Sequence, residues 1–188
     1  MKHNREFEIA WQGLKPGVHT YQYDLNDRFI QEAGKTDADF KDLDAQVTLR
    51  FDKKNNFFLC HFDVDGSVTV PCDRCGEDFK LRLWDEFDLV IKLTDSEEAD
   101  EIEDDADVVF IPRNETVIDI SGWLYEFVML SIPLQRVHPD KENGEPGCNP
   151  EIIKLLNQLS DPGEEPKNDI WKGLDALKEQ KENKRKTK

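Results

Sequence analysis

Two cysteines, Cys72 and Cys75, are separated by two residues and are followed directly by Gly76. This spacing lets both sulfur atoms point at one ion from a tight turn, and the glycine permits the backbone angles that such a turn needs. A structural zinc ion takes four nitrogen or sulfur ligands. The pair therefore predicts half of a Zn²⁺ site, in a zinc-ribbon-like knuckle.

His138 and Cys148 are the best candidates for the other two ligands. Both lie in a loop with glycine and proline that follows a predicted helix, where no apolar periodicity explains them. Cys60, by contrast, alternates with two phenylalanines and is predicted to be a small buried core residue. His61 faces the opposite, polar side of that strand and is expected to be solvated.

The predicted metal site is thus Cys72, Cys75, His138 and Cys148, which would tie a hairpin to the loop after the helix. Two alternatives stay open at this point. His138 and Cys148 can be unrelated loop residues, because their spacing is loose. The cysteine pair can also be a redox dithiol, although such a pair usually begins a helix, and here strands are predicted on both sides.

Alternating apolar residues predict the strands that carry the cysteine pair. One strand covers residues 45–51, and a returning strand covers 58–70 with a turn or bulge at Asp65-Gly66. The longest strand pattern covers residues 79–93 and is broken once, by Asp85. Helical spacing predicts helices over residues 121–130 and 151–159. The fold class is therefore α+β, mainly β: an antiparallel meander or barrel-like sheet with a few short helices.

Nine acids and no base occur between residues 95 and 107, which accounts for −9 of the net charge of −16. Such a block repels itself, so a mobile, solvated loop is expected. It would attract a basic partner, or act only as a solubilising loop. The acids are Asp95, Glu97, Glu98, Asp100, Glu101, Glu103, Asp104, Asp105 and Asp107.

The C-terminal residues differ in kind from the rest. Residues 1–159 are predicted to form a single domain, and residues 160–188 a linker, a short amphipathic helix and a basic tail over Lys178–Lys188. Trp171, Leu174 and Leu177 share one side of that helix. They are candidates for an apolar anchor on a partner, or for docking on the protein's own domain.

Composition narrows the class of protein. The chain has 188 residues with 41 acids against 25 bases. A protein this acidic is not expected to bind nucleic acid by bulk electrostatics. The sequence contains no run of about 18 apolar residues, so a membrane span is not expected. The first residues lack the apolar stretch of a secretory signal, so a cytoplasmic location is expected. In that compartment the four cysteines are expected to be free thiols or metal ligands.

The order of these motifs resembles the YceD-like family of large-subunit ribosomal RNA accumulation proteins. The similar segments are Val70–Phe79 around the cysteine pair, Ile118–Ile120 opening a helix that ends at Ile132-Pro133, and the late Asp169–Lys178. Family proteins commonly carry a second cysteine pair after the helix, where this chain has His138 and Cys148. The resemblance implies a role in synthesis, processing or stability of 23S rRNA, without known enzymatic activity.

No phosphate-binding loop, nucleophile elbow or zinc-protease motif occurs in the sequence. We therefore expect a non-enzymatic factor in ribosome biogenesis that binds a basic ribosomal protein or an assembly intermediate. Two alternatives remain. One is a zinc protein that binds rRNA directly through the knuckle, Arg74, Arg82 and the basic tail. The other is a cysteine-based redox protein.

Overall fold

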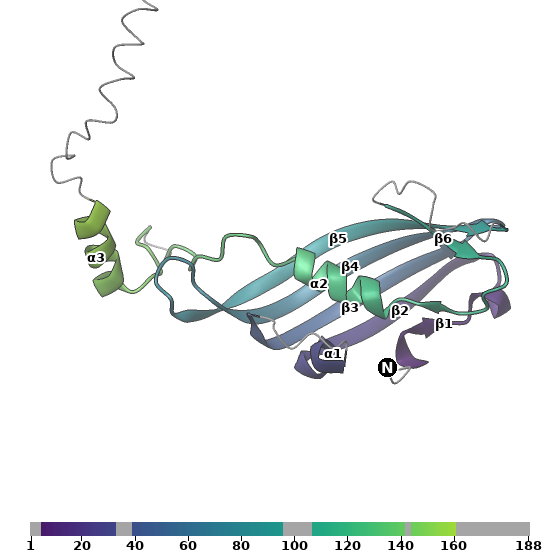
Figure 1. Cartoon of the computed structure of the whole chain (residues 1–188), viewed down its shortest axis with the longest axis horizontal. Helices are drawn as coiled ribbons and strands as arrows, with labels where there is room; N and C mark the ends of the chain where they lie inside the picture. Colours follow the sequence, from purple (N-terminus) through teal and green to yellow (C-terminus); the bar gives the residue numbers. More distant parts are fainter. Residues whose placement is uncertain (1–4, 33–38, 96–106, 142–143, 161–188) are drawn as a thin grey trace, which may run out of the picture. The chain divides into compact units, whose positions relative to one another are not determined.

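The computed structural model of the chain describes residues 5–32, 39–95, 107–141 and 144–160. Strands dominate these residues, with a few short helices (Figure 1), so the expected α+β, mainly β class is confirmed. Short 3₁₀ turns occur at Arg5–Phe7 and Trp11–Gly13. In chain order the elements are β1 (Glu8–Ile9), β2 (Gly17–Asn26), α1 (Asp27–Glu32), β3 (Lys41–Lys53), β4 (Phe57–Pro71), β5 (Asp78–Thr94), β6 (Val108–Pro112), β7 (Ile118–Asp119), α2 (Ser121–Leu130) and α3 (Pro150–Ser160).

The chain divides into two compact units, Met1–Cys148 and Asn149–Lys188. The described part of the second unit includes the amphipathic helix α3. Asn149, directly before the helix, caps it, because its side-chain Oδ1 accepts a hydrogen bond from the backbone amide of Glu151. The predicted domain boundary after residue 159 stays a prediction. Among the described helices, none combines the length and the apolar character that crossing a lipid bilayer requires.

The first unit is built on a five-stranded sheet with the order β2-β3-β4-β5-β6. Strands β2 to β5 form the expected antiparallel meander. The barrel-like prediction is wrong, because the sheet is open and its edge strands, β2 and β6, do not pair with each other. β6 runs parallel to β5, beside Val90–Thr94 only, so the meander ends before the sixth strand.

The expected turn or bulge at Asp65-Gly66 is also wrong. β4 continues through both residues, and the register shift lies in its neighbour β3, between Lys41 and Asp44. Gly66 is required there for a different reason. A side chain at this position would meet the backbone oxygen of Asp44 and would lie 2.5 Å from the Cα of Ala45. The glycine therefore permits a close approach of the two strands.

One face of the sheet carries the core. Phe51, Phe58 and Phe62 are fully buried on it, and α2 lies across this face (Figure 1). The ring of Phe127 from α2 stacks on Phe87 at 4.5 Å and packs against Phe62 at 4.8 Å. The polar residues of α2 are Ser121, Tyr125 and Glu126, and the rest of the helix is apolar or glycine. Packing of these apolar side chains on the sheet therefore accounts for the position of the helix.

The N-terminal segment extends the cover on the same face. β1 pairs with the distant β7 in a small two-stranded sheet, and Ile120 donates a backbone hydrogen bond to Phe7 at 3.0 Å. Trp11 packs edge-on against Phe58, with ring centroids 5.1 Å apart. These contacts leave the opposite side of the sheet uncovered by the described helices of the first unit, α1 and α2. We call that side the open face; it presents Asp24, Gln46, Arg50, Asp65, Trp84 and Asp88.

Candidate metal centre

The tip of the β4–β5 hairpin forms a tight turn that carries the cysteine pair. Gly76 donates a backbone hydrogen bond to the Cys72 carbonyl at 2.8 Å, and Cys72 donates one to the Glu77 carbonyl at 3.0 Å. Gly76 has a φ of 76°, in the left-handed region that glycine adopts without steric cost. The glycine after the second cysteine therefore fulfils the role expected from the sequence, closing the turn so that both sulfur atoms lie on one side.

Asp73 and Arg136 join this turn to the loop that follows α2. The backbone amide of Asp73 donates to the Arg136 carbonyl at 2.7 Å, and the Arg136 amide donates to the Asp73 carboxylate at 2.7 Å. The Arg136 guanidinium also contacts Asp39 at 2.7 Å. These reciprocal bonds fix the loop beside the hairpin two residues before His138.

His138 and Cys148 approach the cysteine pair from that loop. The imidazole of His138 packs on the ring of Phe79, with centroids 4.6 Å apart. Gly147, directly before Cys148, lies where a side chain would collide with the Pro139 carbonyl and would come within 3.2 Å of the His138 Cβ. The glycine thus lets the returning chain pass close enough for Cys148 to reach the site.

The four predicted ligands converge. Cys72 Sγ lies 3.8 Å from Cys148 Sγ, and Cys75 Sγ lies 3.4 Å from His138 Nδ1. All four candidate ligand atoms lie within 4.8 Å of one another. With zinc–sulfur bonds of about 2.3 Å, a tetrahedron separates neighbouring sulfur atoms by about 3.8 Å. The spacing is therefore that of a tetrahedral site, and it is too long for a disulfide, whose sulfur atoms are about 2.05 Å apart.

The protonation chemistry of the thiols also suits a cation. Burial opposes ionisation of Cys72, but hydrogen bonds from the backbones of Cys75, His138 and Arg74 outweigh it and lower the Cys72 pKa to about 6. Burial, followed by the hydrogen bond to Cys72, raises the Cys148 pKa to about 11. Without an ion, the cluster thus favours one thiolate beside a protonated thiol. A bound cation would stabilise more than one thiolate.

This donor set fits zinc. Three sulfurs and one imidazole nitrogen form a Cys₃His set, which is typical of structural zinc sites. Four protein ligands leave no coordination position for water, so the ion would supply cross-linking of two chain segments and no Lewis-acid chemistry. Cys72 and Cys148 are only 2% and 3% exposed, so such a cross-link would be shielded from solvent.

Cys60 and His61, which were not predicted to be metal ligands, differ in how the structure bears out their predicted surroundings. Cys60 is buried in the core as predicted, and desolvation raises its pKa to about 12. The prediction that His61 is merely solvated is wrong. Its Nδ1 lies 2.6 Å from Asp88 Oδ1, and its side chain is 24% exposed. Carboxylates on the adjacent strand positions enclose the ring.

Most of the predicted partner-binding residues lie outside the described residues. This applies to Glu97, Glu98, Asp100, Glu101, Glu103, Asp104 and Asp105, to Trp171, Leu174 and Leu177, and to the tail over Lys178–Lys188. At the two ends of the acidic run, Asp95 pairs with Arg113 at 2.9 Å, and the Asp107 carbonyl accepts a hydrogen bond from Val90. The two described ends are therefore held against the sheet.

The sequence analysis missed the residues that assemble the site, namely Asp73, Arg136 and Phe79. Two of them carry opposite charges close to predicted ligands: Asp73 lies between the two cysteines, and Arg136 lies two residues before His138. This pairing of charges was the available signal. Nothing in the sequence indicates that Phe79 packs on His138, because one residue lies in a predicted strand and the other in a distant predicted loop.

The fold and the centre define a class: an open, mainly β protein whose longest hairpin can be cross-linked to a distant loop by one metal ion. Residues 60–178, more than half of the chain, match the family described as Large ribosomal RNA subunit accumulation protein YceD. The chain belongs to this family. No curated protein and no solved structure matches the sequence.

Proposed function

We propose that this protein is a non-enzymatic factor in large-subunit ribosome biogenesis that acts by binding a basic ribosomal protein or an assembly intermediate. The observation that carries the proposal is the match of residues 60–178 to a family tied to accumulation of large-subunit ribosomal RNA. A zinc ion held by Cys72, Cys75, His138 and Cys148 would have a structural role, fixing the hairpin tip to the loop after α2.

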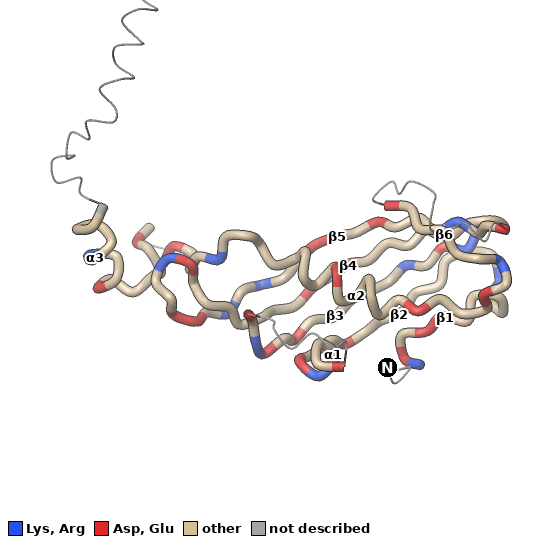
Figure 2. Tube along the Cα trace, in the orientation of Figure 1, with Lys and Arg blue, Asp and Glu red and all other residues tan. Residues whose placement is uncertain are grey.

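The charge of the chain supports a basic protein as the direct partner. With a net charge of −16, the protein repels RNA phosphates except at local basic patches. Ribosomal proteins are strongly basic, and opposite charges raise the rate of encounter at low salt. Acidic positions recur along the described strands, including β4 and β5 (Figure 2).

Deletion of the gene tests the biological role. We expect fewer large subunits in a sucrose gradient and a lower ratio of 23S to 16S rRNA, restored by the wild-type gene. Normal subunit ratios and normal 23S levels in the deletion strain under all growth conditions would refute the proposal.

A binding assay tests the partner class. Proteins extracted from purified large subunits are passed over the immobilised full-length protein, with bovine serum albumin and purified 23S rRNA fragments as matched probes. We expect retention of one or a few basic ribosomal proteins that weakens with salt. Tight binding of the rRNA fragments at physiological salt, with no retained protein, would instead favour the direct rRNA-binding alternative.

The cysteine-based redox alternative is favoured by one observation, the lowered pKa of Cys72, which is about 6. Reactive cysteines, however, lie in partially exposed surroundings, whereas Cys72 is 2% exposed. Elemental analysis of the purified protein separates the two functions. A metal-free protein with a reactive thiol at position 72 would support redox chemistry over a structural ion.

A further inference from the structure

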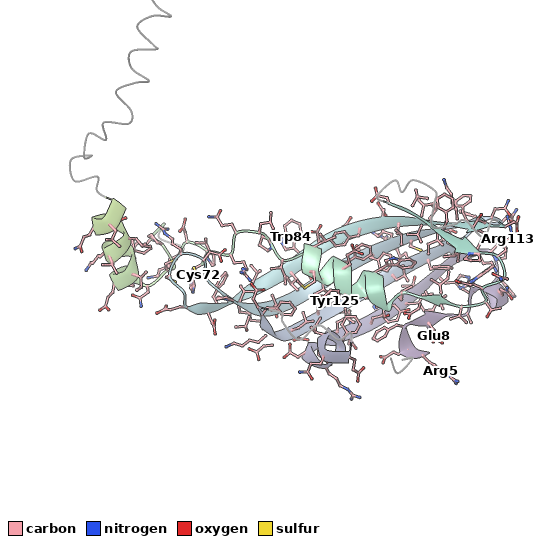
Figure 3. The ribbon with its side chains drawn as sticks, viewed as in Figure 1. Arg5, Glu8, Cys72, Trp84, Arg113 and Tyr125 are labelled. Atoms are coloured by element: carbon pink, nitrogen blue, oxygen red, sulfur yellow. The ribbon has the colours of Figure 1, made fainter. Side chains whose placement is uncertain are left out.

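A second group of polar side chains lies on the open face, at the middle of β4 and β5. Trp84, which belongs to this group, lies away from Cys72 (Figure 3). Antiparallel pairing sets Asp63 opposite Glu86 and Asp65 opposite Trp84. These side chains line a pocket of about 430 Å³, in the lower part of the range found for ligand sites. We call it the Trp84 pocket.

The Trp84 indole is unusually accessible. Trp84 is 74% exposed, while the described aromatic residues of the core face are buried or half-buried. A large apolar ring left in water at the centre of a sheet face indicates a contact surface when polar groups surround it. The ring projects from β5 (Figure 3).

The charges around the indole select the ligand. The open-face residues of the pocket lining carry three carboxylates, of Asp63, Asp65 and Glu86, and one guanidinium, of Arg82, for a net charge of −2. Arg82 is paired with Asp65 at 3.1 Å. The remaining carboxylates repel a phosphate, which argues against base stacking of RNA on Trp84.

His61 adds an unsatisfied acceptor. Its Nδ1 donates to Asp88, because a carboxylate can only accept, so in the neutral ring Nε2 is an acceptor. Nε2 is buried without a hydrogen-bond partner and lies 3.4 Å from Asp63 and 3.8 Å from Glu86. Asp63 is itself paired with Arg50 at 3.5 Å, so the exposed carboxylate of Glu86 is the acceptor most open to a further donor. A guanidinium supplies several donors in a planar fork.

The free edge of β5 favours side-chain recognition over addition of a strand. Among the described residues, no strand pairs with the outer edge of β5 before Val90. There the amide of Glu86 donates to the Asp85 carboxylate at 2.9 Å. This bond occupies one backbone donor of the strand, and charged side chains along an edge disfavour strand addition.

We propose that the Trp84 pocket binds an arginine side chain of a basic protein partner, with the guanidinium over the indole and its N–H groups directed at Asp63 and Glu86. Cation–π contact with tryptophan and charge-assisted hydrogen bonds would act together. The proposal rests on the proposed function for the identity of the partner, and it names the surface and the residue type that the partner presents.

A peptide titration tests the pocket on the full-length protein. The probe is an acetylated and amidated peptide with arginine at every second position, and its binding to the zinc-loaded protein is measured by calorimetry without a chelator. We expect Trp84→Ala to weaken binding about tenfold, and Asp63→Asn combined with Glu86→Gln to weaken it at least as much. Asp24→Asn combined with Asp44→Asn changes the open-face charge equally, outside the pocket, and should stay within about twofold of wild type. Replacing arginine by the neutral isostere citrulline should abolish binding.

Three results would overturn the proposal. They are no binding of the arginine peptide by wild type, equal binding by wild type and the pocket variants, and equal binding of the citrulline peptide. A second equivalent of bound zinc that is lost in the Asp63/Glu86 variant, without peptide binding, would assign the cluster to a metal instead. A wild type that binds the peptide but no large-subunit protein would refute the proposed function and leave the pocket standing. The converse result would refute the pocket alone.

Discussion

Cys75 is the candidate ligand whose removal tests the proposed centre with the least disturbance, because it is half-buried whereas Cys72 and Cys148 are buried. We expect Cys75→Ser to lower bound zinc from one ion per chain to near zero, and to lower the melting temperature, because zinc binding contributes free energy of folding. Elemental analysis and thermal denaturation measure both effects.

Cys60→Ala is the matched control for this variant. It removes a thiol from the core without touching the centre, so zinc should remain at one ion per chain while stability falls by about 1 kcal/mol or less. Metal-free wild-type protein, or a Cys75→Ser variant that keeps its zinc, would contradict the assignment.

Asp73 is predicted to position the centre without binding the ion. Its bonds to Arg136 hold the loop of His138 against the hairpin. We expect Asp73→Ala to weaken zinc affinity by about 10- to 100-fold, the usual size of an outer-residue effect, while saturating zinc still fills the site. Competition with a chromophoric chelator measures the affinity. Asp78→Asn is the control: it removes an exposed ion pair with Lys41 and should leave the zinc affinity unchanged. An equal loss of zinc affinity in both variants would show that the net charge near the site, and not the bonds of Asp73, causes the loss.

At the scale of elements, Gly66 and Gly122 form a pair with opposite expected outcomes. Alanine at 66 would meet the backbone of β3, so we expect Gly66→Ala to destabilise by about 1–3 kcal/mol. Gly122, in α2, has nothing within 4 Å of an added Cβ, so Gly122→Ala should stabilise by about 0.5–1 kcal/mol through helix propensity. Urea denaturation compares them, and a stable Gly66→Ala variant would mean that β3 and β4 separate at this point.

The attachment of α2 depends on Phe127, which packs on both Phe62 and Phe87. We expect Phe127→Ala to cost about 3–5 kcal/mol. Leu130→Ala, at a position 59% exposed on the same helix, should cost about 0.5 kcal/mol or less. The difference in urea midpoint measures the contribution of this contact, and similar midpoints for the two variants would show that α2 is held elsewhere.

Alternation made the central elements predictable. Residues 45–51, 58–70 and 79–93 were assigned to strands because apolar side chains recur at every second position, and this also identified Cys60 as a core residue. The direction of β6 relative to β5 was not predictable, since five apolar residues can pair with a neighbouring strand in a parallel or an antiparallel direction equally well. β1 and β7 have two residues each, too few for a period. The open edges of the sheet follow from pairing between strands, which no local pattern contains.

The two candidate sites differ in the same respect. Cysteine and histidine are rare in this chain, so residue type, together with the alternation that set Cys60 and His61 aside, singled out the four residues of the candidate metal centre. The Trp84 pocket consists of common residues on two strands, and its composition emerges only when the register sets Asp65 opposite Trp84 and Asp63 opposite Glu86. A sequence gives the faces of strands but not the side chains across from them.

For the whole molecule, the net charge of −16 sets the expected behaviour toward a basic partner. Replacing the nine acids between residues 95 and 107 by asparagine and glutamine should lower the association rate with the retained ribosomal protein by about tenfold or more at low salt, with less effect on dissociation. Stopped-flow kinetics at two salt concentrations measures this. Neutralising a similar number of exposed acids elsewhere is the control. An unchanged rate in the variant would show that the run only keeps the protein in solution.

The candidate metal centre is assembled from segments that are far apart in the chain, since positions 72 and 148 are 76 residues apart. A ribosome adding about 5–20 residues per second therefore exposes the first two thiols about 4–15 s before the last ligand is made. During that interval the nascent chain holds an incomplete chelate, open to oxidants and to loosely bound ions. With zinc bound by these four residues, the fraction of molecules that mature correctly would depend on the zinc supply and reducing capacity of the cell at the moment of translation.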